Sequence, residues 1–413
     1  MTSFSPAPSA LDRLICDVAG AEAPAARAFV VASDPDGSLL SWANAHGTAV
    51  VVASDYREYA RAQAHGTAAH ALTQLAPGSA PGAVGVGHLP KSLAGIRYLA
   101  RQLARAGVET LVLGANTKHM SRSMNAELAR SYANVHASRG RGKFRCLVAS
   151  GPLPNLPELE PSTGGPGGRL HAVGGVFGGA SDDAGGRLLA EAFLNDYLVR
   201  VTDTEQRDFK GKTPVTKGKV VTVSREECSN GPFILVDLGC GNGSVSRRVL
   251  DTTGGLIAGF PQDKADSEPT SQVRHEKFDS IDKDRFRFRV LATDVDAAAV
   301  ASARLTLASY ANAGLVSVSW DDAGEQIPDS SADVVLLNPP FHDGAGIDTS
   351  LVEHLLDNAD RLLASGGELY LVYNSHLAYL PAVRRQFGIV QQIVRDRRFT
   401  VLKAWQNQGN RDL

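Results

Sequence analysis

An apolar run leads directly into a glycine-rich turn in the stretch Phe233-Ile234-Leu235-Val236-Asp237-Leu238-Gly239-Cys240-Gly241-Asn242-Gly243. The aliphatic content is typical of a buried strand, and the turn precedes a helical stretch. Glycines at such a strand-to-helix turn let the backbone approach a ligand closely. We therefore expect a nucleotide-like cofactor at this turn and a doubly wound α/β fold around it.

The spacing of the glycines distinguishes two classes of cofactor. Nicotinamide cofactors usually meet a G-x-G-x-x-G turn that binds a pyrophosphate, whereas this turn reads G-x-G-x-G and is led by an aspartate. The pattern favours the class I enzymes that use S-adenosylmethionine. The residues predicted to contact the cofactor from this turn are Asp237, Gly239, Gly241 and Gly243.

Two further aspartates follow the next predicted strands. Asp294 ends the strand that begins near Phe288, where the acidic residue of a doubly wound fold accepts hydrogen bonds from ribose hydroxyls. Asp322 follows the strand 315–318, where a contact to an adenine amine is expected. An aspartate at either position alone is more often a turn or helix-cap residue than a ligand. Their order along the chain, after the glycine-rich turn, favours cofactor binding.

A second unusual motif, Asn338-Pro339-Pro340-Phe341, stops the apolar run 333–337. Prolines cannot donate to a strand ladder, so the chain must leave the sheet at Asn338. The Asn338 amide and the neighbouring carbonyl then offer hydrogen-bond acceptors beside the flat ring of Phe341. Such a group suits a planar substrate that carries an amine. A structural proline turn with a core phenylalanine would give the same sequence.

Length and composition limit the possible classes of protein. The chain has 413 residues, 43% of them hydrophobic, and this length favours two domains. A formal net charge of -2 gives no general attraction to nucleic acid, so a site for a polyanion must be a local patch. The four cysteines lack C-x-x-C spacing, and we expect no metal site. Without a signal peptide or membrane-spanning pattern, the sequence predicts a cytoplasmic protein.

An alternation of strands and helices occurs twice along the chain. The first occurrence, 28–149, has no glycine-rich turn after its first strand. It includes a predicted helix, 93–106, with Leu93, Ile96, Leu99, Ala100 and Leu103 on one face. A stretch rich in proline and glycine, 151–179, precedes the second occurrence. We expect two tandem Rossmann-like doubly wound domains, 1–160 and 171–413.

These residues resemble those of the bacterial ribosomal RNA guanine-N2 methyltransferases. Besides the turn and the Asn-Pro-Pro-Phe motif, the resemblance covers these segments: Gly175–Phe177, Asp183–Arg187, Gly366–Leu369, Tyr379-Leu380, Phe387-Gly388, Arg398–Ala404 and, in the first half, Leu89–Ser92 and Gly114–Met120. It implies that the second domain is a catalytic class I methyltransferase and that the first is a degenerate copy for RNA binding or positioning. It also places Phe177 and Gly185 in a segment that lines the cofactor pocket.

The resemblance implies methyl transfer from S-adenosylmethionine to the exocyclic N2 of a guanosine in ribosomal RNA. The first-half segments favour the large-subunit RNA over the small-subunit RNA as substrate. The catalytic residues would be Asn338, Pro339, Pro340 and Phe341, with the base flipped out and stacked on the phenylalanine. We expect a monomer whose partner is ribosomal RNA or a ribosomal subunit.

Basic residues provide candidates for phosphate contacts with RNA. The principal candidates are Arg139, Arg141, Lys143, Arg145, Arg397 and Arg398, with Arg97, Arg101 and Arg105 on the helix 93–106 as further ones. Arginines spaced in this way also occur on solvated helix faces. Two stretches, 200–231 and 254–287, are longer than the resemblance implies, and they are either RNA-contacting loops, lids or solvated insertions.

Two other functions fit the same motifs. Asn-Pro-Pro-aromatic motifs also serve adenine-N6 and protein-glutamine methyltransferases, whose acceptors present a similar nitrogen. A non-catalytic RNA-binding or assembly module with a decayed cofactor pocket would fit the first half, although the complete turn and Asn338 argue against it for the second half. His342 is either a base or a structural residue that caps the turn.

Overall fold

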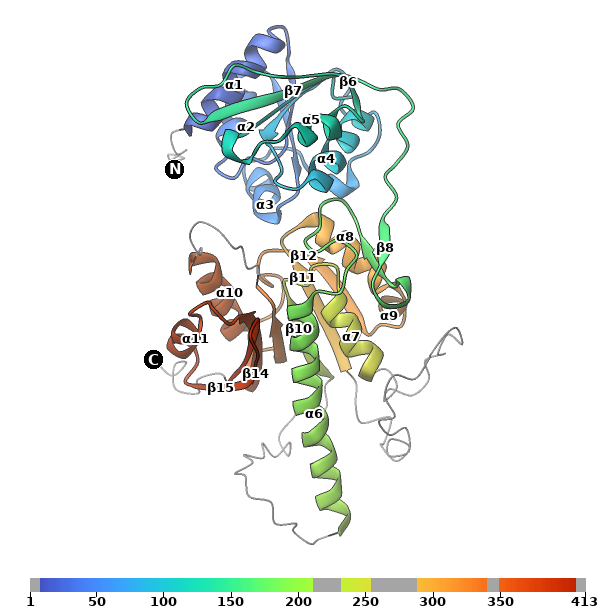
Figure 1. Ribbon diagram of the computed structural model, residues 1–413, viewed down its shortest axis with the longest axis vertical. Helices are drawn as coiled ribbons and strands as arrows, with labels where there is room; N and C mark the ends of the chain where they lie inside the picture. The colour runs from blue at the N-terminus through green and yellow to red at the C-terminus, as the bar shows by residue number, and fades with distance from the viewer. Residues whose placement is uncertain (1–7, 211–231, 254–287, 340–348, 406–413) are drawn as a thin grey trace. The chain divides into compact units, whose positions relative to one another are not determined.

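The computed structural model describes residues 8–210, 232–253, 288–339 and 349–405. Its chain divides into two compact units (Figure 1). The first unit runs to Ser181 and includes Val295–Leu305 and Trp320–Asp322; the remaining described residues form the second unit. The limits 1–160 and 171–413 inferred from the sequence remain predictions. No helix in the described part of the chain is long and apolar enough to cross a membrane.

The first unit is built on a seven-stranded sheet with the order β3-β2-β1-β4-β5-β7-β6. All pairings among strands β1 to β5 are parallel, whereas β7 runs antiparallel to both β5 and β6. The strands are β1 Ala28–Val31, β2 Thr48–Ala53, β3 Ala69–Ala71, β4 Val84–His88, β5 Thr110–Asn116, β6 Tyr132–Ala137 and β7 Phe144–Pro152. The helices are α1 Ala10–Glu22, α2 Ser38–His46, α3 Tyr56–Ala64, α4 Leu93–Ala106 and α5 Arg122–Leu128, with 3-10 turns at Leu72–Gln74 and Thr117–His119.

The second seven-stranded sheet has the order β12-β11-β10-β13-β14-β16-β15, which repeats that of the first. The strands are β10 Phe233–Leu238, β11 Phe288–Asp294, β12 Val316–Trp320, β13 Ala332–Leu337, β14 Leu363–Asn374, β15 Ile389–Arg395 and β16 Phe399–Trp405. The helices are α6 Ala184–Lys210, α7 Ser244–Thr253, α8 Ala297–Thr306, α9 Ala308–Asn312, α10 Thr349–Leu362 and α11 Leu380–Gln386. A small hairpin of β8 Ser162–Gly164 and β9 Leu170–Ala172, joined through a 3-10 turn at Pro166–Gly168, lies between the two sheets in the sequence.

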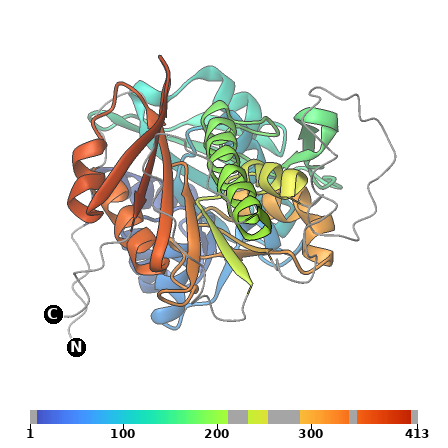
Figure 2. The same ribbon diagram turned by 90° about the horizontal axis from the view of Figure 1, so that it is seen from below.

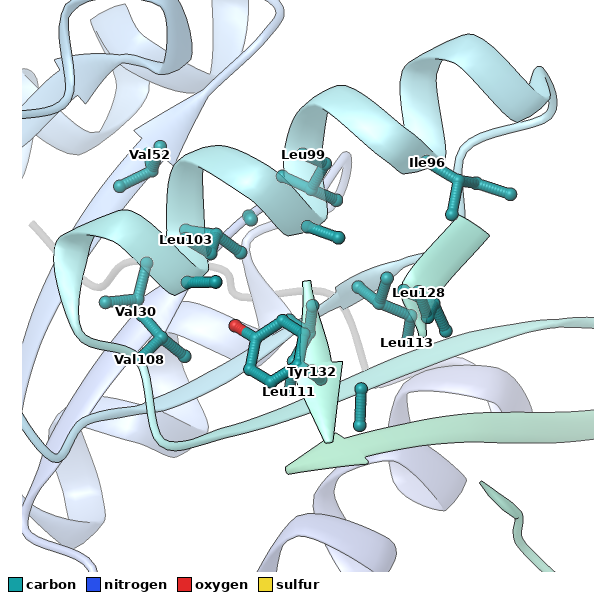
Figure 3. Packing of buried hydrophobic residues seen from close by; sticks show 14 of the residues in the cluster. Val30, Val52, Ile96, Leu99, Leu103, Val108, Leu111, Leu113, Leu128 and Tyr132 are labelled. Atoms are coloured by element: carbon teal, nitrogen blue, oxygen red, sulfur yellow. The ribbon is translucent and has the colours of Figure 1, made fainter. Parts of the chain in front are cut away.

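Alternating side chains of β1 enter two different hydrophobic clusters, so the first sheet is covered on both faces. One face packs against α4, which buries Ile96, Leu99 and Leu103 (Figure 3). The predicted apolar face of this helix is therefore confirmed except at Leu93, which is 41% exposed in the first turn. Tyr132 lies in the same cluster, and its buried hydroxyl has no hydrogen-bond partner among the described residues.

Helix α6 lies along α7 in the second unit (Figures 1 and 2, green and yellow). It also contacts the second sheet at β14 and β16. Phe193 of α6 meets the ring of Tyr370 of β14 edge to face, with ring centroids 5.3 Å apart. This packing places the first turn of α6 close to the ends of the central strands, where the candidate site lies.

Candidate active site

The glycine-rich turn leaves the sheet at the end of β10. The φ angles of Gly239, Gly241 and Gly243 are 80°, 54° and 81°, a region that favours glycine. The amides of Gly239 and Cys240 donate hydrogen bonds to the Thr293 carbonyl at 2.9 and 3.0 Å. The turn is therefore attached to the end of the neighbouring strand β11, and its conformation requires the glycines that the sequence places there.

The turn lies where the strand order reverses, because β10 has β11 on one side and β13 on the other. Ligands of open α/β sheets bind outside the carboxyl ends of the strands at this point. Leu238 of β10 and Leu337 of β13 are register partners, so the turn and Asn338 leave adjacent strands side by side. The structure thus brings together the two motifs that the sequence singled out.

Asp294 is the last residue of β11, and its carboxylate reaches the turn. Its Oδ2 accepts a hydrogen bond from the Gly241 amide at 2.9 Å. This hydrogen bond places the Asp294 carboxylate at the glycine-rich turn, while its predicted contact with a ribose stays a prediction. Asp322 and Phe177 belong to the first unit; Asp322 is half-buried and Phe177 is 63% exposed, and their cofactor contacts also remain predictions.

Asp237 is buried beneath the turn and holds helix α7. Its Oδ2 accepts hydrogen bonds from the Ser246 amide at 3.2 Å and the Ser246 hydroxyl at 2.5 Å. Burial raises the pKa of the Asp237 carboxyl to about 6, against the lowering effect of Ser246 and with a further increase from the charge of Asp294. The sequence pointed to Asp237 as a cofactor ligand but not to Ser246, whose role depends on how α7 folds back over the strand.

We expect Asp237→Asn to change the pH dependence of stability. The folded-state pKa of about 6 lies above the ordinary value of 3.8, so this group stabilises the fold most below pH ~4 and that contribution is lost as pH rises through 6. The full loss corresponds to about 3 kcal/mol. Urea unfolding at pH 5 and pH 7.5 measures how much the free energy of unfolding decreases between these two pH values. We expect this decrease to be about 1 kcal/mol smaller in the variant than in the wild type. Identical decreases in both proteins would contradict the raised pKa.

Asn338 follows the last residue of β13, as the sequence predicts for a chain that must leave the sheet there. Its side-chain Nδ2 donates a hydrogen bond to Asp183 Oδ2 at 2.9 Å. Pro339 is buried, whereas Pro340 and Phe341 lie outside the described residues. Asp183 lay within a segment of the family resemblance, but nothing in its local sequence pointed to Asn338, which is distant along the chain.

Gly185 and its neighbour Gly186 allow the start of α6 to approach Asn338 closely. A Cβ at Gly185 would lie 3.3 Å from the Phe399 ring and 3.5 Å from Asn338 Oδ1. A Cβ at Gly186 would lie 2.9 Å from a methyl of Val245. The absence of side chains at these two positions therefore has a packing reason, and the structure places Gly185 beside the predicted catalytic amide.

The six principal candidates for RNA contacts are exposed. Four of them, at 139–145, belong to the first unit, and Arg397 and Arg398 belong to the second. Arg139, Lys143 and Arg145 make no ion pair with any described residue, whereas Arg141 pairs with Asp17 at 2.6 Å. Arg397 and Arg398 lie in the connection between β15 and β16 and are also exposed.

The helix arginines of α4 have structural partners instead. Arg97 pairs with Glu127 at 2.6 Å and Arg105 with Glu158 at 3.4 Å. Arg101 is only 9% exposed and donates to the Ser131 hydroxyl at 3.1 Å. Its burial excludes Arg101 as a phosphate ligand in this conformation.

Comparison with known proteins relates the chain to methyltransferases. The family model described as Methyltransferase small domain matches residues 280–403. Ribosomal RNA large subunit methyltransferase G of Shewanella amazonensis is 26% identical over 323 residues, which cover 76% of this chain and 67% of that protein. The protein of the same name from Streptomyces coelicolor is 34% identical over 170 residues, or 41% of this chain and 37% of that protein. Ribosomal RNA small subunit methyltransferase C of Pseudomonas paraeruginosa is 42% identical over 116 residues, or 28% of this chain and 34% of that protein.

A solved structure is similar over almost the whole chain. The T. thermophilus 16S rRNA N2 G1207 methyltransferase, in complex with AdoMet and guanosine, superimposes with a TM-score of 0.66 at 19% identity. The match covers 95% of this chain and 92% of that chain. The predicted tandem Rossmann-like fold is confirmed, and so is the resemblance to the ribosomal RNA methyltransferases G and C. That the first domain is degenerate remains a prediction.

Proposed function

We propose that this chain transfers a methyl group from S-adenosylmethionine to the exocyclic N2 of a guanosine in ribosomal RNA. One observation carries the proposal: the glycine-rich turn and Asn338 leave the paired strands β10 and β13 at register partners. A methyl donor held at the turn would therefore lie next to an amine held at Asn338. The names of the relatives support ribosomal RNA as the substrate, and the guanosine complex of the structural neighbour supports the choice of base.

The residues at the turn fit S-adenosylmethionine. A Cβ added at Gly239 or Gly241 would meet no described atom within 4 Å, so there is open space beside the turn that a ligand could fill. The Asp294 carboxylate lies at the same turn, in the position that accepts ribose hydroxyls in doubly wound folds. When bound, the cofactor supplies a methyl group made electrophilic by its positively charged sulfur.

The protein contributes positioning rather than strong acid or base chemistry. The lone pair of guanine N2 is delocalised into the ring, so it needs acceptors that hold both amine hydrogens and favour a tetrahedral nitrogen. Asn338 Oδ1 and the Pro339 carbonyl would accept those hydrogens, and Phe341 would stack on the flipped base. With the amine held in this way, the nitrogen would form a bond to the methyl carbon as the sulfur–carbon bond breaks, and the nitrogen would then lose one proton to water. Correct alignment supplies most of the rate.

Methyl transfer to ribosomal RNA tests the proposal. Ribosomal RNA and intact subunits from a strain that lacks this protein are incubated with the purified chain and S-adenosylmethionine labelled in the methyl group, and the RNA is digested to nucleosides. We expect label in N2-methylguanosine, and separate large- and small-subunit reactions identify the substrate. Label in N6-methyladenosine or in a ribosomal protein would instead support the other amine acceptors that suit the motif.

A non-catalytic RNA-binding module is the other candidate, because the first unit has exposed basic residues of its own. Isothermal titration calorimetry with S-adenosylmethionine distinguishes the two functions. A catalytic second unit should bind with measurable heat, whereas a decayed pocket should produce none.

We expect the hairpin between β6 and β7 to hold RNA phosphates. Replacing Arg139, Lys143 and Arg145 together by glutamine should weaken RNA binding uniformly across sequences. It should also reduce the slope of log affinity against log salt by roughly 2 to 3, since each phosphate contact contributes about 0.7–0.9. Filter binding over a range of salt concentrations measures this slope.

Arg27→Gln is the matched single-site control. Arg27 is exposed and precedes β1, so it lies at the amino ends of the parallel strands, whereas the hairpin lies at their carboxyl ends. A single substitution at Arg145 should reduce the slope by about 1, whereas the Arg27 substitution should leave it unchanged. Equal effects at the two positions would mean that the hairpin is not a specific footprint.

A further inference from the structure

The Asn338 side chain has two chemically opposite ends. Its Oδ1 accepts hydrogen bonds and its Nδ2 donates them, so only the oxygen end suits an amine that must be held by its hydrogens. Asp183 determines which end is available, because an ionised carboxylate accepts hydrogen bonds but cannot donate them. Asn338 Nδ2 lies 2.9 Å from Asp183 Oδ2, and this contact leaves Oδ1 as the end that is turned away from the carboxylate.

Asp183 is itself held by the helix that it begins. Its Oδ2 accepts a hydrogen bond from the Gly186 amide at 2.7 Å, which is the geometry of a helix N-cap. Its carbonyl accepts the first backbone hydrogen bond of α6, from the Arg187 amide at 2.8 Å. The orientation of the carboxylate therefore follows from the start of α6 rather than from its contact with Asn338.

The helix is attached to the sheet at a second point. Asp196, further along α6, accepts a hydrogen bond from the buried Lys403 of β16 at 2.8 Å and another from the Tyr370 hydroxyl of β14. The glycines in the first turn let the helix pack directly against Asn338. These contacts fix the position of α6 on the sheet, and the first turn of the helix therefore stays next to the Asn338 side chain.

We propose that Asp183 is a positioning residue that holds Nδ2 of Asn338 so that Oδ1 is the atom presented to the substrate amine. That the amine is guanine N2 rests on the function proposed above, whereas the orientation of the amide applies to any amine acceptor. Without Asp183 the amide can rotate by half a turn, which places its NH2 group against the NH2 group of the substrate. Productive alignment is then lost without the loss of a group that binds cofactor.

Two substitutions separate positioning from helix capping. In Asp183→Ser the hydroxyl still caps the Gly186 amide, because serine is a good N-cap, but it is too short to reach Asn338. In Asp183→Asn the side-chain oxygen that accepts from Gly186 also accepts from Asn338, so the amide keeps its orientation. We expect kcat to fall about 100-fold in Asp183→Ser and to stay within a few-fold of wild type in Asp183→Asn. The KM for RNA, the Kd for S-adenosylmethionine and the melting temperature should not change in either variant.

A readout that does not depend on methyl transfer tests the hydrogen bond directly. In protein labelled with 15N at asparagine side chains, the signals of Asn338 are those that disappear in Asn338→Ala. We expect the Asn338 NH2 protons to move upfield and exchange faster with water in Asp183→Ser but not in Asp183→Asn. Asp183→Ser should also cause no further loss of activity in the Asn338→Ala background.

The outcomes separate this inference from the proposed function. Wild-type kcat or unchanged Asn338 signals in Asp183→Ser would overturn the positioning role, and so would a parallel loss of cofactor affinity. A wild-type chain that methylates no guanosine N2 would overturn the proposed function alone. The Asn338 signals would still decide the orientation of the amide in that case.

Discussion

Asn338→Ala is expected to reduce methyl transfer by at least about 100-fold while the affinity for S-adenosylmethionine stays near that of the wild type. The substitution removes the acceptor that aligns the amine, and the glycine-rich turn that would bind the cofactor is on the neighbouring strand. The fold should persist, because Asp183 retains its hydrogen bond from the Gly186 amide. Single-turnover transfer to RNA and calorimetry with S-adenosylmethionine measure the two quantities separately.

Asn195→Ala is a suitable control for this experiment. Asn195 is an exposed asparagine on α6, so its removal should change neither transfer nor cofactor affinity. Loss of both quantities together in Asn338→Ala would mean that Asn338 supports the cofactor pocket rather than the acceptor amine. The catalytic role assigned to it would then be wrong.

Lys403→Met is expected to lower the free energy of unfolding by about 3–5 kcal/mol, the usual cost of breaking a buried ion pair from one side. The Lys403 side chain is only 4% exposed, and its Nζ lies 2.8 Å from Asp196 Oδ2 and 2.9 Å from Glu368 Oε1. Methionine preserves most of the volume but leaves the Glu368 carboxylate, 9% exposed, without its cation. Urea unfolding followed by circular dichroism at neutral pH measures the change.

A second substitution identifies the cause of that loss. Glu368→Gln in the Lys403→Met background removes the uncompensated charge, and the glutamine oxygen can still accept the hydrogen bond from Trp405 Nε1. We expect the double variant to regain much of the lost stability. Lys91→Met, at an exposed position, should have little effect. A loss below about 1 kcal/mol in Lys403→Met would show that the cluster is solvated in solution.

Much of the fold could be predicted from local pattern. The apolar strands, the glycine-rich turn and the proline stop at Pro339 each depend on a few consecutive residues. The edge strands β6 and β15 carry no such local signal, because their mostly exposed side chains do not form the apolar runs by which buried strands are recognised.

The same distinction applies to the site residues: local backbone features can be predicted from the sequence, whereas contacts between distant residues cannot. The sequence alone determined that a glycine-rich turn follows β10 and that the chain leaves the sheet at Asn338, because glycine and proline restrict the backbone locally. Only the tertiary structure decided that Asn338 donates a hydrogen bond to Asp183, that Ser246 donates hydrogen bonds to Asp237, and that Arg101 is buried rather than exposed. Each of these pairings joins elements that meet only when helices pack on a sheet, and a carboxylate or guanidinium carries no local signal of which partner it will find.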